Sequence, residues 1–568
     1  MRTFGHDPPR TLATGLISPN PALVTTRAAQ RLPRPVLLLF CAAYVLPGLF
    51  GRDPWKGADI TAFGYMLAIA EDRTSWLHPM VGGLPGESAL LPYWIGATFI
   101  RLLSPWVDPA FAARVPFALL LLLVLALVWY ATYDLARTGP AQPLPLAFGG
   151  EASPVDYARA IADGAVLAVI ACLGLLQLGH ETTPELAQLA SVGCFLYGFA
   201  ALPFRPRSAR VALVLALPAL AASGAPSIAV ALGIVAAVSC RLSTDLAVRQ
   251  ATRWISASAV ASAVVAASVG AWAWRLGRYE SATQVFAMLR ELVWFTWPAW
   301  PLALWTLWRW RARLLSRHIV FPLACVVIAL LACIAMGGSD RALMLALPPL
   351  AVLAAFALPT LQRSTAAAID WFSVFFFTIA ALTVWVVYAS MQTGVPAKPA
   401  ANVARLSPGY EHSFSAVALV AALLATLGWL WLVHWRTRRT RHPLWKSMVL
   451  PAAGVSLNWL LVMTLLLPPL DHARSYRSLV NRIAQRVPPQ SCVAAPGMTR
   501  AQVVALEYFG GYRVDAATAA DASACDWLLV AETRPGPRPP GTGWTLVGRE
   551  RRNARDDEVT AIYRRASG

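Results

Sequence analysis

Long apolar runs recur along almost the whole chain and are separated by short segments rich in arginine. A helix needs roughly 20 such residues to cross the hydrocarbon core of a bilayer. We therefore expect about thirteen transmembrane helices, at residues 35–50, 113–135, 161–179, 186–204, 210–222, 226–240, 254–274, 292–308, 319–336, 343–359, 371–391, 414–434 and 447–467. The pattern predicts a mainly α-helical, polytopic membrane protein.

The charges of the connecting loops predict how the chain is oriented. The segment 89–104 is apolar but is disturbed by Pro92, Arg101 and Pro105, so we expect it to lie at the membrane surface. With that segment excluded from the spans, the basic loops all fall on one side of the membrane: 204–210, 240–253, 309–317 and 434–446. Cytoplasmic loops carry the excess of Lys and Arg in membrane proteins. We expect the basic tail 1–34 in the cytoplasm and the C-terminus in the periplasm.

The composition supports a membrane protein and excludes two other classes. Hydrophobic residues make up 57% of the 568 residues, charged residues only 14%, and the mean hydropathy is +0.54, unlike a soluble globular protein. The formal net charge of +19 comes from clusters between apolar runs, which is the positive-inside pattern and not a nucleic-acid-binding surface. We therefore expect membrane lipids and no nucleic acid as partners.

A polar region, 469–568, follows the membrane domain at 35–468. It has helical patterns at 473–486 and 501–509, and strand patterns at 492–496, 525–532, 544–549 and 559–565, so we expect a small periplasmic α/β domain. Cys492 and Cys525 begin two of these strands and are the only cysteines outside the apolar runs. Disulfides form in the periplasm, so we predict a bond between them. Two separate buried thiols are the alternative.

The first polar loop, 51–112, is unusually long and charged for a chain of this kind. The segment 59–72 has helical spacing, with Phe63, Met66, Leu67 and Ala70 on one side. We expect it to lie along the membrane surface with its apolar face at the lipid headgroups, which would hold Asp59 just above the bilayer. A plain connecting loop is the alternative.

The predicted topology places several titratable side chains on the periplasmic face. They are Asp53, Asp59, His78, Glu87, Arg114, His180, Glu181, Glu185, Asp340 and Arg341. A carboxylate there can act as a general base on an acceptor hydroxyl, and arginines can neutralise the phosphate of a leaving lipid. Two carboxylates and a histidine can also hold a divalent metal, for which Glu87 and His78 are the candidates. For each of these side chains taken alone, the sequence favours a solvated loop or a capping role.

Several short motifs in sequence order resemble those of the GT-C lipid-linked-sugar glycosyltransferases, in particular the aminoarabinose transferase and protein O-mannosyltransferase superfamily. They are Ala58-Asp59-Ile60, Trp76-Leu77-His78-Pro79, Glu87-Ser88-Ala89, Tyr93-Trp94, Ala113-Arg114-Val115-Pro116, Phe295-Thr296-Trp297-Pro298 and Ser339-Asp340-Arg341 with Leu347-Pro348-Pro349. The resemblance covers roughly residues 35–360. Ile60 stands in place of a second acid, and Ser88 and the turn Ser223-Gly224-Ala225-Pro226 lack the lysines of the family pattern.

The resemblance implies roles for individual residues. Asp59 would be the general base, Glu87 and Glu181 sugar or metal ligands, and Arg114 and Arg341 phosphate ligands. Arg52, Lys56 or Arg341 would replace the missing lysines. It implies an inner-membrane enzyme that moves a sugar from a polyprenyl-phosphate carrier to a periplasmic acceptor such as lipid A, a glycan or a protein. No cofactor is implied beyond the divalent metal. The alternatives are a transporter or flippase for a polyprenyl-linked saccharide and a catalytically silent relative.

Overall fold

The structure is a computed structural model of the chain. It describes residues 21–87, 89–146, 148–243, 245–272, 276, 277, 279, 281–437, 443–532, 541, 543–552 and 559–566. Parts of several predicted segments lie outside the described residues: the tail 1–34, the basic loops 240–253 and 434–446, and the end of the span 254–274. Most of residues 534–543, the Pro/Gly-rich connection expected between two strands of the C-terminal domain, also lies outside them. Ser88 also lies outside them.

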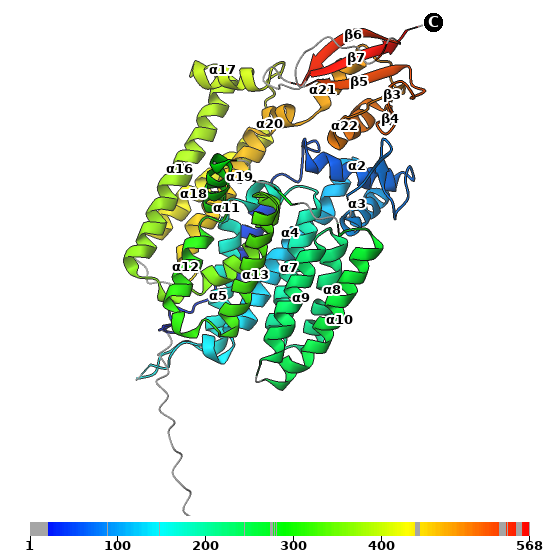
Figure 1. Cartoon of the computed structure of the whole chain (residues 1–568). Helices are drawn as coiled ribbons and strands as arrows, with labels where there is room; N and C mark the ends of the chain where they lie inside the picture. The colour runs from blue at the N-terminus through cyan, green and yellow to red at the C-terminus, as the bar shows by residue number, and fades with distance from the viewer. Residues whose placement is uncertain are drawn as a thin grey trace, which may run out of the picture.

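A bundle of helices forms the larger part of the molecule (Figure 1). Its members are α1 (Arg34–Val45), α4 (Pro109–Ala136), α5 (Pro154–Ala171), α6 (Leu175–Leu178), α7 (Pro184–Ala201), α8 (Pro206–Ala222), α9 (Pro226–Arg241), α10 (Leu246–Ser268), α11 (Ala282–Phe295), α12 (Ala299–Arg309), α13 (Arg317–Ala335), α14 (Asp340–Met344), α15 (Leu347–Ala355), α16 (Arg363–Thr393), α17 (Ala397–Leu406), α18 (Ala416–Thr437) and α19 (Lys446–Leu465). Short 3-10 turns lie at Gly139–Ala141, Arg311–Arg313 and Leu358–Thr360. The apolar helix α15 is buried along its whole length and lies at the core of the bundle.

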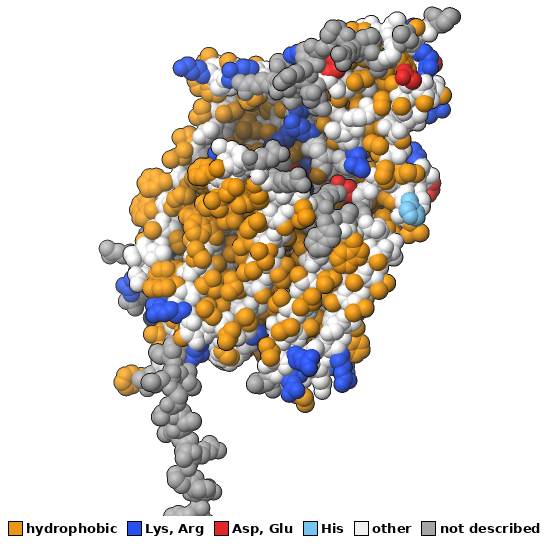
Figure 2. All heavy atoms as spheres, in the orientation of Figure 1, with side chains coloured by type: hydrophobic (Ala, Val, Ile, Leu, Met, Phe, Trp, Pro, Cys, Tyr) orange, Lys and Arg blue, Asp and Glu red, His pale blue; other side chains and the backbone are white. Residues whose placement is uncertain are grey.

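A helix overlaps every predicted span, which confirms the polytopic, mainly α-helical fold. Among the described residues, six segments are long and apolar enough to cross a membrane by themselves: Pro109–Ala136, Arg317–Ala335, Asp340–Thr360, Arg363–Thr393, Ala416–Arg436 and Lys446–Leu465. Large apolar side chains are exposed on the outside of α4, α16 and α18. Figure 2 shows a broad apolar surface on the face of the bundle that is turned to the viewer. A surface of this kind is expected to face lipid.

Two predicted spans differ in detail from the helices that form. The segment 292–308 is not one helix, because the chain breaks between α11 and α12 at Trp297 and Pro298. Proline lacks the N–H that a continuous helix needs. The segment 161–179 likewise contains two helices, α5 and the short α6, with the break at Cys172.

The prediction that 59–72 lies along the membrane with one face in lipid is wrong. This segment forms α2 (Ala58–Ala70), and ten of its thirteen residues are buried on all sides of the helix. A helix that is apolar all round is normally buried by protein. Here α3 (Leu90–Leu103), which coincides with the predicted surface segment 89–104, covers one side of α2, and the C-terminal domain covers another (Figure 1).

Close packing fixes α2 in place. Gly96 of α3 lies against Met66, where a Cβ atom would meet the Met66 sulfur at 2.2 Å. Arg101 of α3 donates from Nε to the carbonyl of Ala70 at 3.0 Å and so satisfies the C-terminal end of α2. On the opposite side, a Cβ atom at Gly64 would overlap Val504 of the C-terminal domain.

The C-terminal region forms the predicted α/β domain. Its elements are α20 (Leu467–Arg474), α21 (Arg477–Ala484), β3 (Cys492–Ala494), α22 (Arg500–Gly510), β4 (Arg513–Asp515), β5 (Trp527–Glu532), β6 (Trp544–Arg551) and β7 (Val559–Arg565). The sheet order is β4-β3-β5-β7-β6, with β3 parallel to β4 and β5, and β7 antiparallel to β5 and β6. The predicted helix 473–486 is instead two helices, interrupted at Ser475. The strand β4 was not predicted, because its sequence, Arg513-Val514-Asp515, contains no apolar run.

A disulfide joins Cys492 and Cys525 in the structure, with their Cα atoms 4.9 Å apart. The two residues come together because β3 and β5 are adjacent and parallel, with Val493 opposite Trp527. A Cα separation of about 4.4–6.8 Å is the usual range for a disulfide. The bond links the start of the domain to its central strand.

A small hairpin of the first loop also attaches to this domain. Its strands are β1 (Met80–Val81) and β2 (Leu84–Pro85). The carbonyl of Gly82 accepts the Ala516 N–H at 2.9 Å, and the Gly82 N–H donates to Glu507 at 3.1 Å. The first loop and the C-terminal domain therefore form one continuous layer at one end of the bundle (Figure 1).

Candidate functional site

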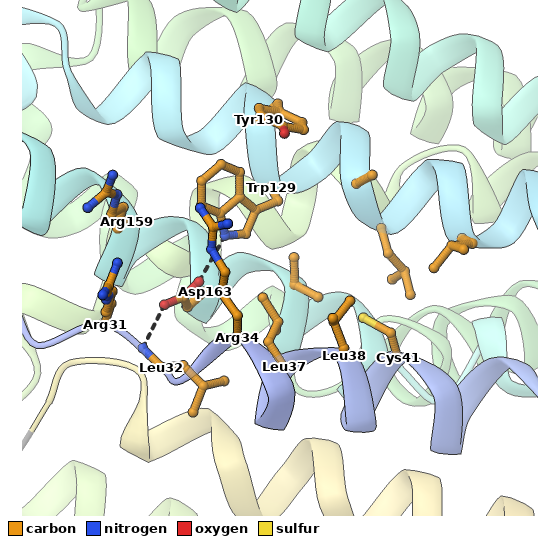
Figure 3. Close-up of a pocket in the computed structure, with 14 residues that line it drawn as sticks. Arg31, Leu32, Arg34, Leu37, Leu38, Cys41, Trp129, Tyr130, Arg159 and Asp163 are labelled. Atoms are coloured by element: carbon orange, nitrogen blue, oxygen red, sulfur yellow. Dashed lines mark hydrogen bonds between the residues drawn. The ribbon is translucent and has the colours of Figure 1, made fainter.

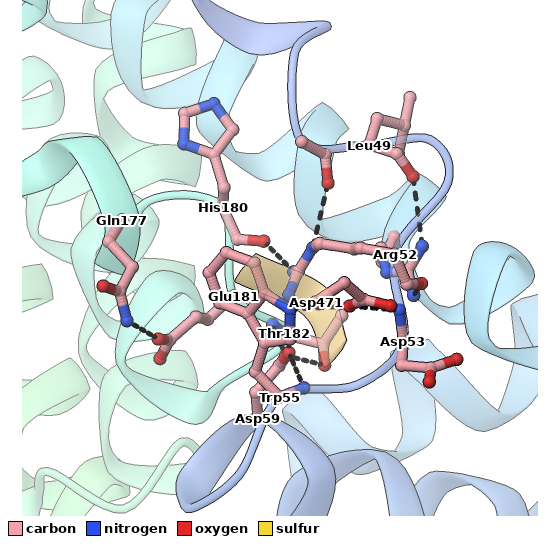
Figure 4. A network of polar contacts seen from close by, with 12 residues as sticks. Leu49, Arg52, Asp53, Trp55, Asp59, Gln177, His180, Glu181, Thr182 and Asp471 are labelled. Carbon is pink, nitrogen blue, oxygen red and sulfur yellow. Dashed lines mark hydrogen bonds and ion pairs between the residues drawn. The ribbon is translucent and has the colours of Figure 1, made fainter. Parts of the chain in front are cut away.

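A buried ion pair lies where the first loop enters α2 (Figure 4). The Nη1 atom of Arg52 is 2.8 Å from Oδ2 of Asp59, and each side chain is only 2% exposed. The same guanidinium donates to two carbonyls, from Nε to Gly48 at 3.0 Å and from Nη2 to His180 at 2.6 Å. Arg52 therefore fixes the loop and holds the carboxylate at the same time.

The carboxylate of Asp59 accepts hydrogen bonds on both oxygens. Besides Arg52, Oδ2 accepts the Trp55 N–H at 3.0 Å, and Oδ1 accepts both the N–H and the hydroxyl of Thr182, each at 2.7 Å. Burial alone would raise the pKa of Asp59, but the charge of Arg52 and these hydrogen bonds outweigh it and lower the pKa. The N-terminus of α2 also favours a negative charge in its first turn. Asp59 is therefore ionised at neutral pH.

Arg114 holds the backbone of the first loop in place. It lies in the first half of α4 and is 5% exposed. Its Nη1 donates to the Leu49 carbonyl at 3.2 Å, and its Nη2 donates to the Arg52 carbonyl. The guanidinium thus positions the backbone of the residue that holds Asp59.

The loop between α6 and α7 connects this ion pair to a second cluster. Glu181, next to Thr182, accepts from Gln177 at 2.8 Å and from Nη2 of Arg341 at 2.6 Å. Arg341 also lies 3.3 Å from Glu185 and is 24% exposed. The loops at 180–185 and 340–341, predicted to share a face, are in direct contact.

The first helix of the C-terminal region, α20, completes the site. Asp471 of α20 accepts from the indole Nε1 of Trp55 at 2.8 Å and from the Asp53 N–H at 2.9 Å. Burial, and then the nearby charge of Asp53, raise the pKa of Asp471. Arg52 and Arg474 lie over the Trp55 ring, at 4.8 and 4.9 Å from its centre. Trp55 is therefore enclosed by two arginines.

Arg474 differs from the other arginines of the site. It is half-buried, and in the part of the chain that the structure describes its guanidinium has no ion-pair partner. Burial lowers the pKa of Arg474, the negative charge of Glu181 raises it in part, and Arg52 lowers it again. A hollow opens below α17 in Figure 2, with basic side chains at its edge next to the C-terminal domain.

His180 is a structural member of the site. Its Nδ1 lies 2.7 Å from the Leu176 carbonyl and its Nε2 lies 2.8 Å from the Tyr44 carbonyl. Burial lowers the pKa of His180 to about 4, so the ring is neutral at pH 7. A neutral imidazole carries one N–H, so one of these two contacts is a hydrogen bond and the other is not.

Five of the predicted site residues come together: Arg52, Asp59, Arg114, Glu181 and Arg341. The side chains of three others, Lys56, His78 and Glu87, lie apart from the ion pair. Lys56 has an exposed side chain, although its N–H donates to the Arg474 carbonyl at 3.0 Å. His78 is exposed, and Glu87 follows the β1–β2 hairpin beside Tyr65 and Arg500.

The described residues contain no group of three or more His, Cys, Asp or Glu side chains placed to hold a metal ion. Glu87 and His78 do not form such a group with a third ligand. The divalent metal remains a prediction from the sequence.

Four further residues of the site were not predicted to take part: Trp55, Thr182, Asp471 and Arg474. Asp471 and Arg474 lie more than 410 residues from Trp55 along the chain, so no local spacing connects them. The signal in the sequence was the tripeptide Leu470-Asp471-His472 directly after the last apolar run, which places charge at the end of a span.

Comparison of the sequence with protein-family models and with curated proteins gives no match. Two solved structures are similar in fold. ArnT from Cupriavidus metallidurans bound to undecaprenyl phosphate has a TM-score of 0.57 at 15% identity, over 94% of this chain and 97% of that one. ArnT from the same organism in the apo state has a TM-score of 0.58 at 15% identity, over 93% and 98%. The chain thus has the fold of the GT-C glycosyltransferase ArnT over nearly its whole length, as the motifs of the first loop predicted.

Proposed function

We propose that this protein is a membrane glycosyltransferase that moves a sugar from a polyprenyl-phosphate carrier to an acceptor hydroxyl. Its fold matches that of a transferase solved with undecaprenyl phosphate, and it has exposed apolar helices beside which a lipid carrier can lie. The observation that carries the proposal is the buried, ionised carboxylate of Asp59. It lies at the end of the bundle where five arginines gather: Arg52, Arg114, Arg341, Arg474 and Arg477.

In the proposed reaction the acceptor oxygen attacks the anomeric carbon of the sugar, and the bond from that carbon to the phosphate oxygen breaks. The acceptor proton passes to Asp59, and the polyprenyl phosphate leaves with the bonding electrons. Oδ1 of Asp59 already accepts a hydroxyl, that of Thr182. An acceptor hydroxyl that replaces Thr182 Oγ1 would be within hydrogen-bond reach, as a general base requires.

The leaving phosphate needs positive charge. Among the arginines of the site, Arg52 and Arg114 are buried and hold the loop, and Arg477 is exposed but pairs with Asp53. Arg474 and Arg341 are partly exposed. We assign the phosphate to Arg474 and Arg341. Lys56, whose side chain is exposed and whose backbone N–H donates to the Arg474 carbonyl, is proposed as a further phosphate ligand at the surface. A charge-assisted hydrogen bond to phosphate is about twice as strong as a neutral one. Glu181 would orient Arg341, and Glu87 is proposed as a sugar ligand on the hairpin side.

The acceptor is proposed to be lipid A, a surface glycan or a protein of the periplasm. The proposal is tested by mass spectrometry of lipid A and of surface glycans from cells with and without the gene. We expect one glycan mass to disappear without the gene and to return with the wild-type gene but not with the Asp59→Asn variant. An unchanged set of masses, or full restoration by Asp59→Asn, would exclude Asp59-dependent transfer.

Arg474→Gln is expected to lower kcat/KM for the lipid-linked donor by about 10- to 100-fold, since a hydrogen bond to a charged group contributes roughly 1.5–3 kcal/mol. Glutamine keeps a polar side chain next to Trp55 but removes the charge. Arg549→Gln is the matched control, because Arg549 pairs with Glu532 at the outer part of the sheet. Equal activity of the two variants would remove Arg474 from the phosphate site.

The orientation proposed from the charges places the C-terminal domain in the periplasm. A reporter fused after Gly568 is expected to report the periplasm, and one after Arg441 the cytoplasm. In the same cells Cys492 and Cys525 should resist alkylation until a reductant is added, because disulfides persist in the periplasm. Two reporters in one compartment, or two free thiols in the folded protein, would contradict this orientation.

A further inference from the structure

A cavity of about 340 Å³ lies between α1, α4 and α5, in the half of the bundle away from the C-terminal domain. Figure 3 shows the residues that line it. It is lined by residues 31–41 at the start of α1, by residues 122–130 in the second half of α4 and by residues 159–166 of α5. The opposite end of α4 is marked by Asp108, which accepts from Tyr508 of the C-terminal domain. The volume is within the range of about 300–1,000 Å³ typical of ligand sites.

One end of this cavity is basic. Arg31, Arg34 and Arg159 line it, against the single carboxyl group of Asp163. That carboxyl group is already engaged, since its oxygens accept the Leu32 N–H at 2.9 Å and the Trp129 indole N–H at 2.8 Å. Neither Arg31 nor Arg34 has an ion-pair partner in the described part of the chain, and both are exposed. The basic end therefore has charge available for an anion.

The remainder of the cavity is apolar and opens towards the outside of the bundle. Figure 3 shows Leu37, Leu38 and Cys41 following one another along α1, away from Arg31 and Arg159. Leu38 is 65% exposed and Leu122, across the cavity on α4, is 43% exposed. In a membrane protein such leucines face acyl chains, so a lipid tail can enter from the side.

This cavity is separate from the Asp59 site. Arg114 and Trp129 lie on the same helix, fifteen residues apart, which corresponds to about 22 Å along the helix axis. A phosphate held at Arg31 and Arg34 is therefore too far away to take part in the proposed transfer. A ligand of this cavity would therefore differ from the substrates of the proposed transfer.

We propose that the cavity binds an anionic membrane phospholipid, with its phosphate on Arg31, Arg34 and Arg159 and one acyl chain along Leu37, Leu38 and Cys41. Basic pockets between transmembrane helices bind lipid headgroups of this charge in other proteins. One end of the cavity is basic, and the rest is apolar and open to the side. This combination favours an anion that carries a hydrocarbon chain, and disfavours a soluble phosphate. The inference is independent of the proposed transferase activity.

The test uses native mass spectrometry of the purified full chain in detergent with added phosphatidylglycerol or phosphatidylcholine. We expect wild type to retain phosphatidylglycerol in preference. Arg31→Gln with Arg34→Gln should weaken phosphatidylglycerol binding by roughly tenfold or more, from the loss of two charges. Ala126→Trp should block binding of the lipid without altering the core, because Ala126 lines the cavity and is exposed.

Arg207→Gln with Arg210→Gln is the matched control, since it removes two exposed charges from the start of α8 and leaves the cavity intact. It should bind phosphatidylglycerol like wild type. Three outcomes would overturn the proposal: no headgroup preference in wild type, equal loss in both double variants, or unchanged binding by Ala126→Trp. Displacement of the phospholipid by equimolar undecaprenyl phosphate would also overturn it, because the cavity would then belong to the carrier.

Discussion

Asp59→Asn is expected to lower the rate of glycosyl transfer by about 10²–10⁴-fold, the usual effect of removing a general base. Asparagine has nearly the same shape and its amide oxygen can still accept from Thr182, so the loop retains part of its hydrogen bonding. It cannot take a proton from the acceptor. The measurement is the initial rate with a polyprenyl-phosphate sugar donor, on protein that elutes from gel filtration like wild type.

Asp53→Asn provides the matched control for this result. Asp53 is the neighbouring carboxylate, but it faces the domain surface, where it accepts from Ser475 at 2.7 Å and pairs with Arg477. We expect its variant to keep a rate within a few-fold of wild type. Near-wild-type activity of Asp59→Asn together with an inactive Asp53→Asn would move the catalytic role to Asp53.

Arg52→Met is expected to destabilise the protein by about 3–5 kcal/mol, because it leaves the carboxylate of Asp59 buried without its partner. The Asp59→Leu variant should lower the free energy of unfolding by a similar amount, because it leaves the guanidinium of Arg52 buried without its partner. The double variant should lose less than the two singles together, by roughly 0.5–3 kcal/mol, since neither charge is then left alone. The shift in the midpoint of thermal unfolding in detergent measures all three.

The pH dependence provides a second check on the same pair. The pKa of Asp59 is lowered in the folded protein, so its stabilisation is complete above the ordinary aspartate pKa and is lost as the pH falls through the folded value. Wild type should therefore lose stability in acid more steeply than the double variant. The two charges would not interact if the losses of stability in the two single variants added up to the loss in the double variant. The same conclusion would follow if wild type and the double variant lost stability in acid in parallel.

The spans could be predicted from the sequence because long apolar runs have few alternatives in a bilayer. The helix at 58–70 shows the limit of this reasoning. We expected its apolar residues to face lipid, but they pack against α3 and Val504. The spacing of apolar residues within a helix shows that a face is buried, but not whether lipid or protein covers it. Pro298 could have indicated the break between α11 and α12. We predicted one span there because the residues on both sides of the proline are apolar.

Only part of the site could be predicted from the sequence. Arg52, Asp59 and Arg114 lie close in sequence or in a recognisable motif, and the loops at 180–185 and 340–341 could be paired by topology. Asp471 and Arg474 could not be assigned, because their partner Trp55 lies at the opposite end of the chain. Tertiary contacts of that kind carry no local pattern.

The bond between Trp55 and Asp471 spans 416 residues, and this has a consequence for how the protein matures. Ribosomes add about 5–20 residues per second, so the first loop leaves the ribosome roughly 20–80 s before α20. During that interval Arg52 and Asp59 have only each other and the early loops as partners. Every truncated chain that ends before Leu467 lacks Asp471 and Arg474, so we expect proteolysis or premature termination to leave Trp55 without these two partners and to impair the proposed transfer.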